Sequence, residues 1–131
     1  MRRSYDAGEI SRVRVILTVE DDSQVAALLA DTLIALGYAA HVAQTAGDAL
    51  MMVEIERPDA ILLDINLPDS SGISTLDRLR QVRPDVPIIM VTGNADEELA
   101  RETLSHGAFA YVMKPFNIDR LTRVLEAALA S

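Results

Sequence analysis

The stretch ILLDINLPDSSG, residues 61–72, joins a run of aliphatic residues to a run of turn residues, with one carboxylate, Asp64, near the junction. Aliphatic residues that do not alternate with polar ones are typical of a parallel strand buried on both faces of a sheet. The Pro, Asp, Ser and Gly residues that follow favour a turn. The stretch therefore predicts a buried strand at residues 60–63 that delivers Asp64 to the edge of a sheet.

The same pattern continues along the chain in both directions. Four more aliphatic runs have the length of strands, at residues 12–19, 38–43, 86–92 and 109–113. Segments with helical periodicity follow the five strands, at residues 24–36, 45–56, 73–82, 95–105 and 118–130. A strand followed by a helix, five times over, predicts an α/β fold. The expected architecture is a doubly wound (βα)5 domain with a five-stranded parallel sheet covered on both faces.

Cap residues mark the ends of the predicted helices. Ser23, Thr45 and Asn117 are expected N-caps of the first, second and last helix, and Gly37 suits a left-handed C-terminal cap. In the first helix, the apolar stripe through residues 25, 28, 29, 32 and 36 is expected to face the core. Ile34 falls opposite this stripe and is expected to be exposed.

The length and composition bound the class of protein. A chain of 131 residues, half of them hydrophobic, suits one compact domain, which we place at residues 12–131 after a flexible leader at residues 1–11. No apolar run approaches the length of a membrane span, and the leader lacks the hydrophobic segment of a secretory signal. These two features predict a cytoplasmic location, and the absence of cysteine fits a reducing compartment.

The charge and the aromatic content argue against direct nucleic-acid binding. The chain has 20 acidic and 12 basic residues, for a formal net charge of −8, which disfavours contact with a phosphate backbone. Three Tyr, two Phe and no Trp leave few platforms on which bases could stack.

Polar residues gather where the predicted strands end. Glu20 and Asp21 follow the first strand, Asp64 follows the third, Thr92 ends the fourth and Lys114 follows the fifth. Taken alone, each has an ordinary structural interpretation as a cap, turn or surface residue. Ligands of open parallel sheets, however, bind at the carboxyl ends of the strands. The combination therefore favours one site at this edge.

The chemistry of such a site follows from its charges. Clustered carboxylates repel one another, and a hard divalent cation such as Mg²⁺ offsets that repulsion while leaving positions for phosphate oxygens. Lys114 would supply a second cationic partner. A cation and an ammonium beside Asp64 would form an anion clamp suited to phosphoryl transfer, with Asp64 as nucleophile and Thr92 as a hydrogen-bond donor.

Four motifs, VEDDS, LLDINLPDSSG, IIMVTGNA and YVMKPF, resemble the receiver domain of two-component response regulators. The resemblance extends from about residue 13 to residue 130. It implies the CheY-like, flavodoxin-like fold with strand order 2-1-3-4-5.

The resemblance also implies roles for the residues at the strand ends. Asp64 takes the position of the phosphoacceptor, and Lys114 that of the lysine that contacts the phosphoryl group. Glu20, Asp21 and Asp64 take the positions of the Mg²⁺ ligands, and Asn66 would add its backbone carbonyl. Glu20 stands where the family more often has Asp, a variation that leaves the metal site intact.

Further positions concern the switch and the lifetime of the phosphoryl group. The resemblance implies that Thr92 and Tyr111 act as the switch hydroxyl and the switch aromatic residue. Pro115 takes the position of a proline that follows a cis peptide bond. Asn66 and Asn94 lie where side chains tune how long the phosphoryl group persists.

The resemblance implies a signalling phosphoacceptor rather than a turnover enzyme. A histidine kinase or a histidine phosphotransfer domain would donate the phosphoryl group, and the domain would later dephosphorylate itself. The last helix ends at Ala130, so we expect a stand-alone domain, or one detached from an output domain, that signals by contact with a downstream protein. The resemblance also allows a homodimer. Ile34, on the first helix, is a candidate contact for the histidine-containing partner.

Two alternatives from other functional classes stay open. A phosphatase of the haloacid dehalogenase type also uses a strand-end Asp, Mg²⁺ and Lys, but it needs a second Asp where this chain has Asn66, and it needs a cap segment. A receiver that acts as a phosphorylation-independent scaffold is the other alternative. The intact set of Asp21, Asp64, Thr92 and Lys114 argues against it.

Overall fold

The computed structural model of the chain describes residues 12–93 and 97–130, and within these ranges five strands alternate with five helices. The strands are β1 (Val15–Val19), β2 (Ala39–Ala43), β3 (Ala60–Asp64), β4 (Ile88–Thr92) and β5 (Ala110–Met113). The helices are α2 (Ser23–Ala35), α3 (Ala46–Ile55), α4 (Gly72–Val82), α5 (Glu97–Ser105) and α6 (Ile118–Ala130). The predicted (βα)5 alternation is confirmed. The predicted leader at residues 1–11 and Asn94 lie outside the described ranges.

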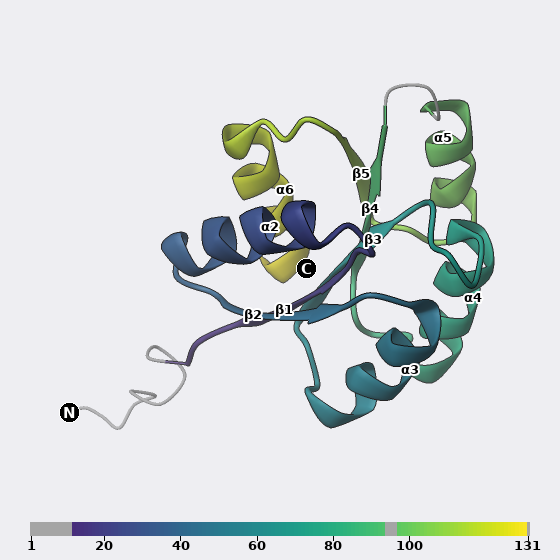
Figure 1. Ribbon diagram of the computed structural model, residues 1–131, viewed down its shortest axis with the longest axis horizontal. Coiled ribbons are helices and arrows are strands. Elements are labelled where there is room, and N and C mark those ends of the chain that lie inside the picture. Colours follow the sequence, from purple (N-terminus) through teal and green to yellow (C-terminus); the bar gives the residue numbers. More distant parts are fainter. Residues whose placement is uncertain (1–11, 94–96, 131) are drawn as a thin grey trace.

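The five strands form one parallel sheet in the order β2-β1-β3-β4-β5, as the resemblance implied. Helices α2 and α6 cover one face of the sheet, and α3, α4 and α5 cover the other (Figure 1). Every strand therefore ends at the same edge, and both faces of the sheet are buried. No helix within residues 12–93 and 97–130 is long and apolar enough to cross a membrane.

The central strand β3 is buried along its whole length. Ile61 and Leu63 belong to the apolar cluster under α3, α4 and α5, whereas Ala60 and Leu62 belong to the cluster under α2 and α6. Successive side chains of a strand point to opposite faces, so a strand covered on both sides needs apolar residues at every position. This explains why the sequence of β3 shows no alternation until Asp64.

The N-cap of α2 is Asp22, so the expectation of Ser23 is wrong by one residue. Asp22 has extended backbone angles, and its Oδ1 accepts hydrogen bonds from the N–H groups of Gln24 and Val25 at 2.9 and 3.1 Å. A carboxylate can satisfy two free N–H groups of the first turn at once, which favours the earlier cap. The caps Thr45 and Asn117 and the left-handed Gly37 are as predicted.

The buried stripe of α2 also differs from the expected one. The buried residues are Ala26, Leu29 and Leu33, whereas Leu28 is 62% exposed. Apolar residues occupy more than one side of this helix, so the sequence alone does not fix which side faces the sheet. Ile34 is 59% exposed, as predicted.

Candidate functional site

Three carboxylates meet at the carboxyl edge of the sheet. Glu20 and Asp21 follow β1 directly, and Asp64 is the last residue of the neighbouring strand β3. One oxygen atom from each of the three carboxylates lies within 4.8 Å of the others. The side chains of Glu20 and Asp64 are 2% and 8% exposed, whereas Asp21 is open to solvent. The predicted acidic cluster is therefore present, and one of its members faces outward.

Backbone pairing fixes where these carboxylates lie. The Glu20 N–H donates to the Ala43 carbonyl at 2.9 Å, which continues the β1–β2 ladder one residue past the strand. The Ile65 N–H donates to the Val91 carbonyl at 3.0 Å and continues the pairing of β3 with β4 in the same way. Both acidic residues are therefore held by the rigid sheet rather than by a free loop.

Lys114 reaches this cluster from the end of β5. Its Nζ lies 2.8 Å from Glu20 Oε1 and 3.4 Å from Asp64 Oδ2. Its backbone N–H donates to the Thr92 carbonyl at 2.7 Å, and the peptide bond to Pro115 is cis, as the resemblance implied. The chain thus brings together an ammonium and three carboxylates that lie up to 94 positions apart in the sequence.

Burial and pairing act in opposite directions on the pKa values of this cluster. Burial raises the pKa of Glu20 above its usual value, although Lys114 and the N–H of Asp22 partly offset this effect. Partial burial alone would lower the pKa of Lys114, but its pairs with Glu20 and Asp64 outweigh burial, and the pKa is raised. Lys114 is therefore cationic near neutral pH, and three carboxyl groups face only one ammonium. The remaining negative charge suits a hard cation with oxygen ligands.

The backbone after Asp64 turns tightly and returns to the end of the strand. The Asn66 N–H donates to Asp64 Oδ1 at 3.1 Å, and Asn66 forms an isolated antiparallel bridge with Ser71. A Cβ atom on Gly72 would lie 2.6 Å from the backbone oxygen of Ile65, so the close approach at this point requires glycine. The predicted loop is therefore a closed turn that lies against the phosphoacceptor candidate.

A contact that we did not predict fastens this turn to α3. Asp69 Oδ1 accepts from the Ala46 N–H at 2.9 Å, and Asp69 Oδ2 accepts from the Gly47 N–H at 3.1 Å. These hydrogen bonds lower the pKa of Asp69, and the bond from the Ala46 N–H has the largest effect. In the sequence Asp69 is only one of several turn residues. The one available signal is that Thr45, the cap of α3, leaves N–H groups of the first turn to be satisfied by another residue.

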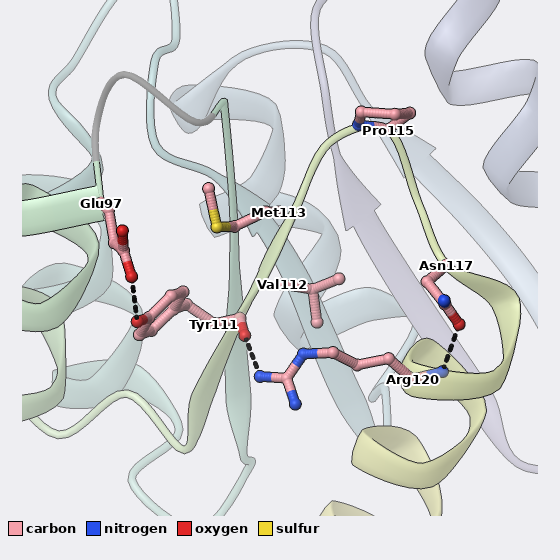
Figure 2. A pocket seen from close by; sticks show the side chains of 7 residues that line it. All are labelled: Glu97, Tyr111, Val112, Met113, Pro115, Asn117 and Arg120. Carbon is pink, nitrogen blue, oxygen red and sulfur yellow. Dashed lines mark hydrogen bonds between the residues drawn. The ribbon is translucent and has the colours of Figure 1, made fainter.

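Thr92 and Tyr111 lie on the neighbouring strands β4 and β5. Thr92 is fully buried at the end of β4, and its hydroxyl donates to the Gly93 carbonyl at 3.0 Å. The Tyr111 hydroxyl donates to Glu97 Oε2 at 3.4 Å, and the Tyr111 carbonyl accepts from Arg120 at 2.9 Å (Figure 2). Glu97 begins α5 and Arg120 lies in α6, so Tyr111 is held between two helices.

These contacts border a hollow of about 340 Å³ between α5, β5 and α6. Figure 2 shows the side chains that line it, which are Glu97, Tyr111, Val112, Met113, Pro115, Asn117 and Arg120. The acidic cluster does not contribute to this lining. The structure therefore brings Glu20, Asp21, Asp64 and Lys114 together in one site and places Tyr111 outside it, in the hollow between α5, β5 and α6.

Comparison with known proteins agrees with this geometry. Residues 16–126 match the family model of the response regulator receiver domain. The nitrogen assimilation regulatory protein NtrX of Azorhizobium caulinodans is 38% identical over 116 residues, which cover 87% of this chain and 26% of NtrX. The transcriptional regulatory protein KdpE of Staphylococcus aureus is 38% identical over 114 residues, covering 85% of this chain and 49% of KdpE. The chain thus spans about a quarter to a half of these curated relatives.

Solved structures with the same fold include isolated receiver domains. The receiver domain of NtrX from Brucella abortus matches with a TM-score of 0.85 and 33% identity, over 88% of this chain and 98% of that chain. A CheY-like receiver domain protein from Methanospirillum hungatei matches with a TM-score of 0.84 and 36% identity, over 91% of this chain and 95% of that chain.

Proposed function

Since the chain belongs to the response regulator receiver domain family, we propose that it accepts a phosphoryl group on Asp64 and changes its surface in response. The observation that carries this proposal is the arrangement around Asp64. A buried carboxylate at a strand end has an ammonium 3.4 Å away and two further carboxylates within 4.8 Å. An ordinary turn aspartate has no need of such partners.

The proposed step is the transfer of a phosphoryl group from a phosphohistidine. A carboxylate oxygen of Asp64 attacks the phosphorus, the new O–P bond forms, the N–P bond breaks, and the released imidazole takes up a proton. Lys114, beside Asp64 Oδ2, would pair with the oxygens of the transferred group, and the Thr92 hydroxyl would turn from the Gly93 carbonyl to donate to them. Attack by water later breaks the O–P bond and returns the carboxylate and inorganic phosphate.

The donor set at the site fits Mg²⁺. Glu20, Asp21 and Asp64 each offer one oxygen, these oxygens lie within 4.8 Å of one another, and we propose the backbone carbonyl of Asn66 as a further ligand. When bound, Mg²⁺ would neutralise negative charge on the phosphoryl group in transfer. Asp22 is not part of this set, because its carboxylate caps α2.

We propose Thr92 and Tyr111 as the elements that report phosphorylation at the surface. A phosphoryl group on Asp64 would draw the hydroxyl of the buried Thr92 away from Gly93, and Tyr111 on the adjacent strand lines the hollow between α5 and α6. One covalent charge would then alter a surface that a downstream protein reads. A histidine kinase or a histidine phosphotransfer domain in the cytoplasm is the proposed donor, and Asn66 and Asn94 are the proposed lifetime-tuning residues.

Intact mass spectrometry tests the proposal directly. The protein is incubated with acetyl phosphate and Mg²⁺, and the wild type should gain the mass of one phosphoryl group. The gain should disappear in Asp64→Asn and in excess chelator. Asp85→Asn is the matched control, because Asp85 is an exposed aspartate at the opposite end of the sheet and should leave the gain unchanged.

A wild type that folds and takes up no phosphoryl group under these conditions overturns the proposal. That result would favour the alternative of a scaffold that works without phosphorylation. Phosphoryl uptake that persists in Asp64→Asn would place the acceptor elsewhere in the chain and would contradict the role given to Asp64.

A further inference from the structure

The contact between Asp69 and α3 is the feature that the proposed function leaves unexplained. Asp69 lies in the turn between β3 and α4, and each of its two carboxylate oxygens accepts a hydrogen bond from a different backbone N–H at the start of α3. Both donors, Ala46 and Gly47, are more than 20 positions away in the sequence. The two bonds therefore join the turn beside the phosphoacceptor to another element of the fold.

Helix α3 does not depend on Asp69 for its cap. Thr45 has extended backbone angles, and its Oγ1 accepts from the Asp48 N–H at 3.1 Å, which is the usual N-cap contact. Asp69 satisfies two other N–H groups of the first turn. The N-cap contact of Thr45 is thus complete without Asp69, whose two hydrogen bonds are additional and come from another element of the fold.

The position of Asp69 in the turn connects it with the site. Asn66, three residues earlier, donates its N–H to Asp64 Oδ1 and is the proposed source of a backbone carbonyl for Mg²⁺. On the other side, Ser71 forms the bridge with Asn66, and Gly72 lies against Ile65. The turn is thus closed on itself at its base, and Asp69 ties its outer part to α3.

The geometry points to Asp69 as a positioning residue for the Asp64 site. By fastening the turn to α3, its carboxylate holds the backbone of residues 65–67 in the conformation that presents the Asn66 N–H and carbonyl to the site. This inference rests on the proposed function for its consequence in Mg²⁺ binding. The tether itself is present in the protein without metal. Without the tether the turn would sample other conformations, and only a fraction of the molecules would be competent to bind Mg²⁺.

The test compares three variants with the wild type. Asp69→Ala removes both hydrogen bonds, and Asp69→Asn keeps one acceptor oxygen but turns an N–H donor toward a backbone N–H. Thr45→Ala is the matched control, because it removes the N-cap of the same helix and leaves Asp69 in place. Hydrogen exchange measured by mass spectrometry on peptides covering residues 65–71, without metal, reports the tether, and titration calorimetry with MgCl₂ reports the site.

We expect faster exchange in the turn and Mg²⁺ binding weaker by on the order of tenfold in Asp69→Ala, in line with the loss of a contact that orients a ligand. Asp69→Asn should fall between Asp69→Ala and the wild type. Thr45→Ala should lower the stability of α3 while its turn exchange and Mg²⁺ affinity stay close to those of the wild type. If Asp69 only stabilised α3, the Asp69 and Thr45 variants would show the same hydrogen exchange in the turn and the same Mg²⁺ affinity.

The outcomes separate the two ideas. If the wild type binds Mg²⁺ and takes up a phosphoryl group while Asp69→Ala behaves like Thr45→Ala in both measurements, the positioning role is wrong and the proposed function stands. If Asp69→Ala loosens the turn but the wild type itself binds no Mg²⁺, the tether is real, the proposed function fails, and the role of Asp69 in positioning the site fails with it.

Discussion

Replacing Asp64 with Asn should make the metal-free protein more stable, because the site stores electrostatic repulsion. Glu20 and Asp21 each have an oxygen within 4.8 Å of an Asp64 oxygen, and at an effective dielectric constant of about 20 unit charges at that limiting distance repel by about 3.5 kcal/mol. The attraction between Asp64 and Lys114 across 3.4 Å is about 5 kcal/mol on the same basis. Repulsion exceeds attraction by about 2 kcal/mol, and the exposure of Asp21 reduces this excess, so we expect a gain of about 1–2 kcal/mol.

The assay is urea unfolding followed by circular dichroism, with and without Mg²⁺. Asn keeps the oxygen that accepts from the Asn66 N–H, and Lys114 keeps its partner Glu20, so the substitution changes mainly the charge. Mg²⁺ at ten times its dissociation constant should stabilise the wild type by about 1.4 kcal/mol and should stabilise Asp64→Asn much less, because one carboxylate ligand is lost. The m-value should not change, which shows that the same surface is exposed on unfolding.

Asp85→Asn is the control for a general effect of removing negative charge. The Asp85 side chain is 75% exposed, and its ion pair with Arg83 is 3.5 Å long, so its removal should change the free energy of unfolding by less than about 0.5 kcal/mol. The electrostatic reasoning is refuted if Asp64→Asn is less stable than the wild type without metal. It is also refuted if Mg²⁺ stabilises both proteins equally.

Substitutions at Gly72, Asp59 and Tyr111 each test one contact of the structure. Gly72→Ala places a Cβ atom 2.6 Å from the Ile65 oxygen and should cost about 1–3 kcal/mol in urea unfolding, and a loss below the experimental error would contradict the close approach. Partial burial would raise the pKa of Asp59, but hydrogen bonds from the Val15 N–H and Arg12 outweigh burial and lower this pKa below 3.8. The wild type should therefore be more stable than Asp59→Asn above about pH 5 and should lose that advantage as the pH falls below about 4. An advantage that persists unchanged at about pH 3 would show that the carboxylate charge is not its source. Tyr111→Phe removes one exposed hydrogen bond of 3.4 Å and should change stability by less than about 0.5 kcal/mol while phosphoryl uptake by intact mass stays unchanged, whereas loss of uptake would make Tyr111 part of the transfer step.

The alternation of strands and helices and the composition of the site edge could be predicted from the sequence. Strand β3 needs apolar residues at every position because both of its faces are buried, and that requirement is visible in the printed sequence. In a parallel sheet all strands end at one edge, so the order of elements was enough to predict that Glu20, Asp21, Asp64 and Lys114 meet. The structure confirms that these four residues converge.

Contacts that depend on how elements pack against one another needed the tertiary structure. The apolar residues of α2 are compatible with more than one buried side, and only packing against the sheet shows that Leu29 is buried and Leu28 exposed. The choice of Asp22 over Ser23 as N-cap became clear only from the two hydrogen bonds that the Asp22 carboxylate accepts in the first turn of α2. The tie from Asp69 to α3 and the contact between Glu97 and Tyr111 each join two elements, and no local pattern identifies which residue supplies the partner.

The physical reason is the range over which each constraint acts. Hydrophobic periodicity and turn chemistry act over a few residues, so the sequence by itself determined the (βα)5 order and the placement of charged residues at strand ends. A hydrogen bond between a turn and the first turn of a distant helix depends on the relative position of two elements to within an ångström. Only the packed sheet and its five helices set that position, and it is there that Asp69 acquires its partners.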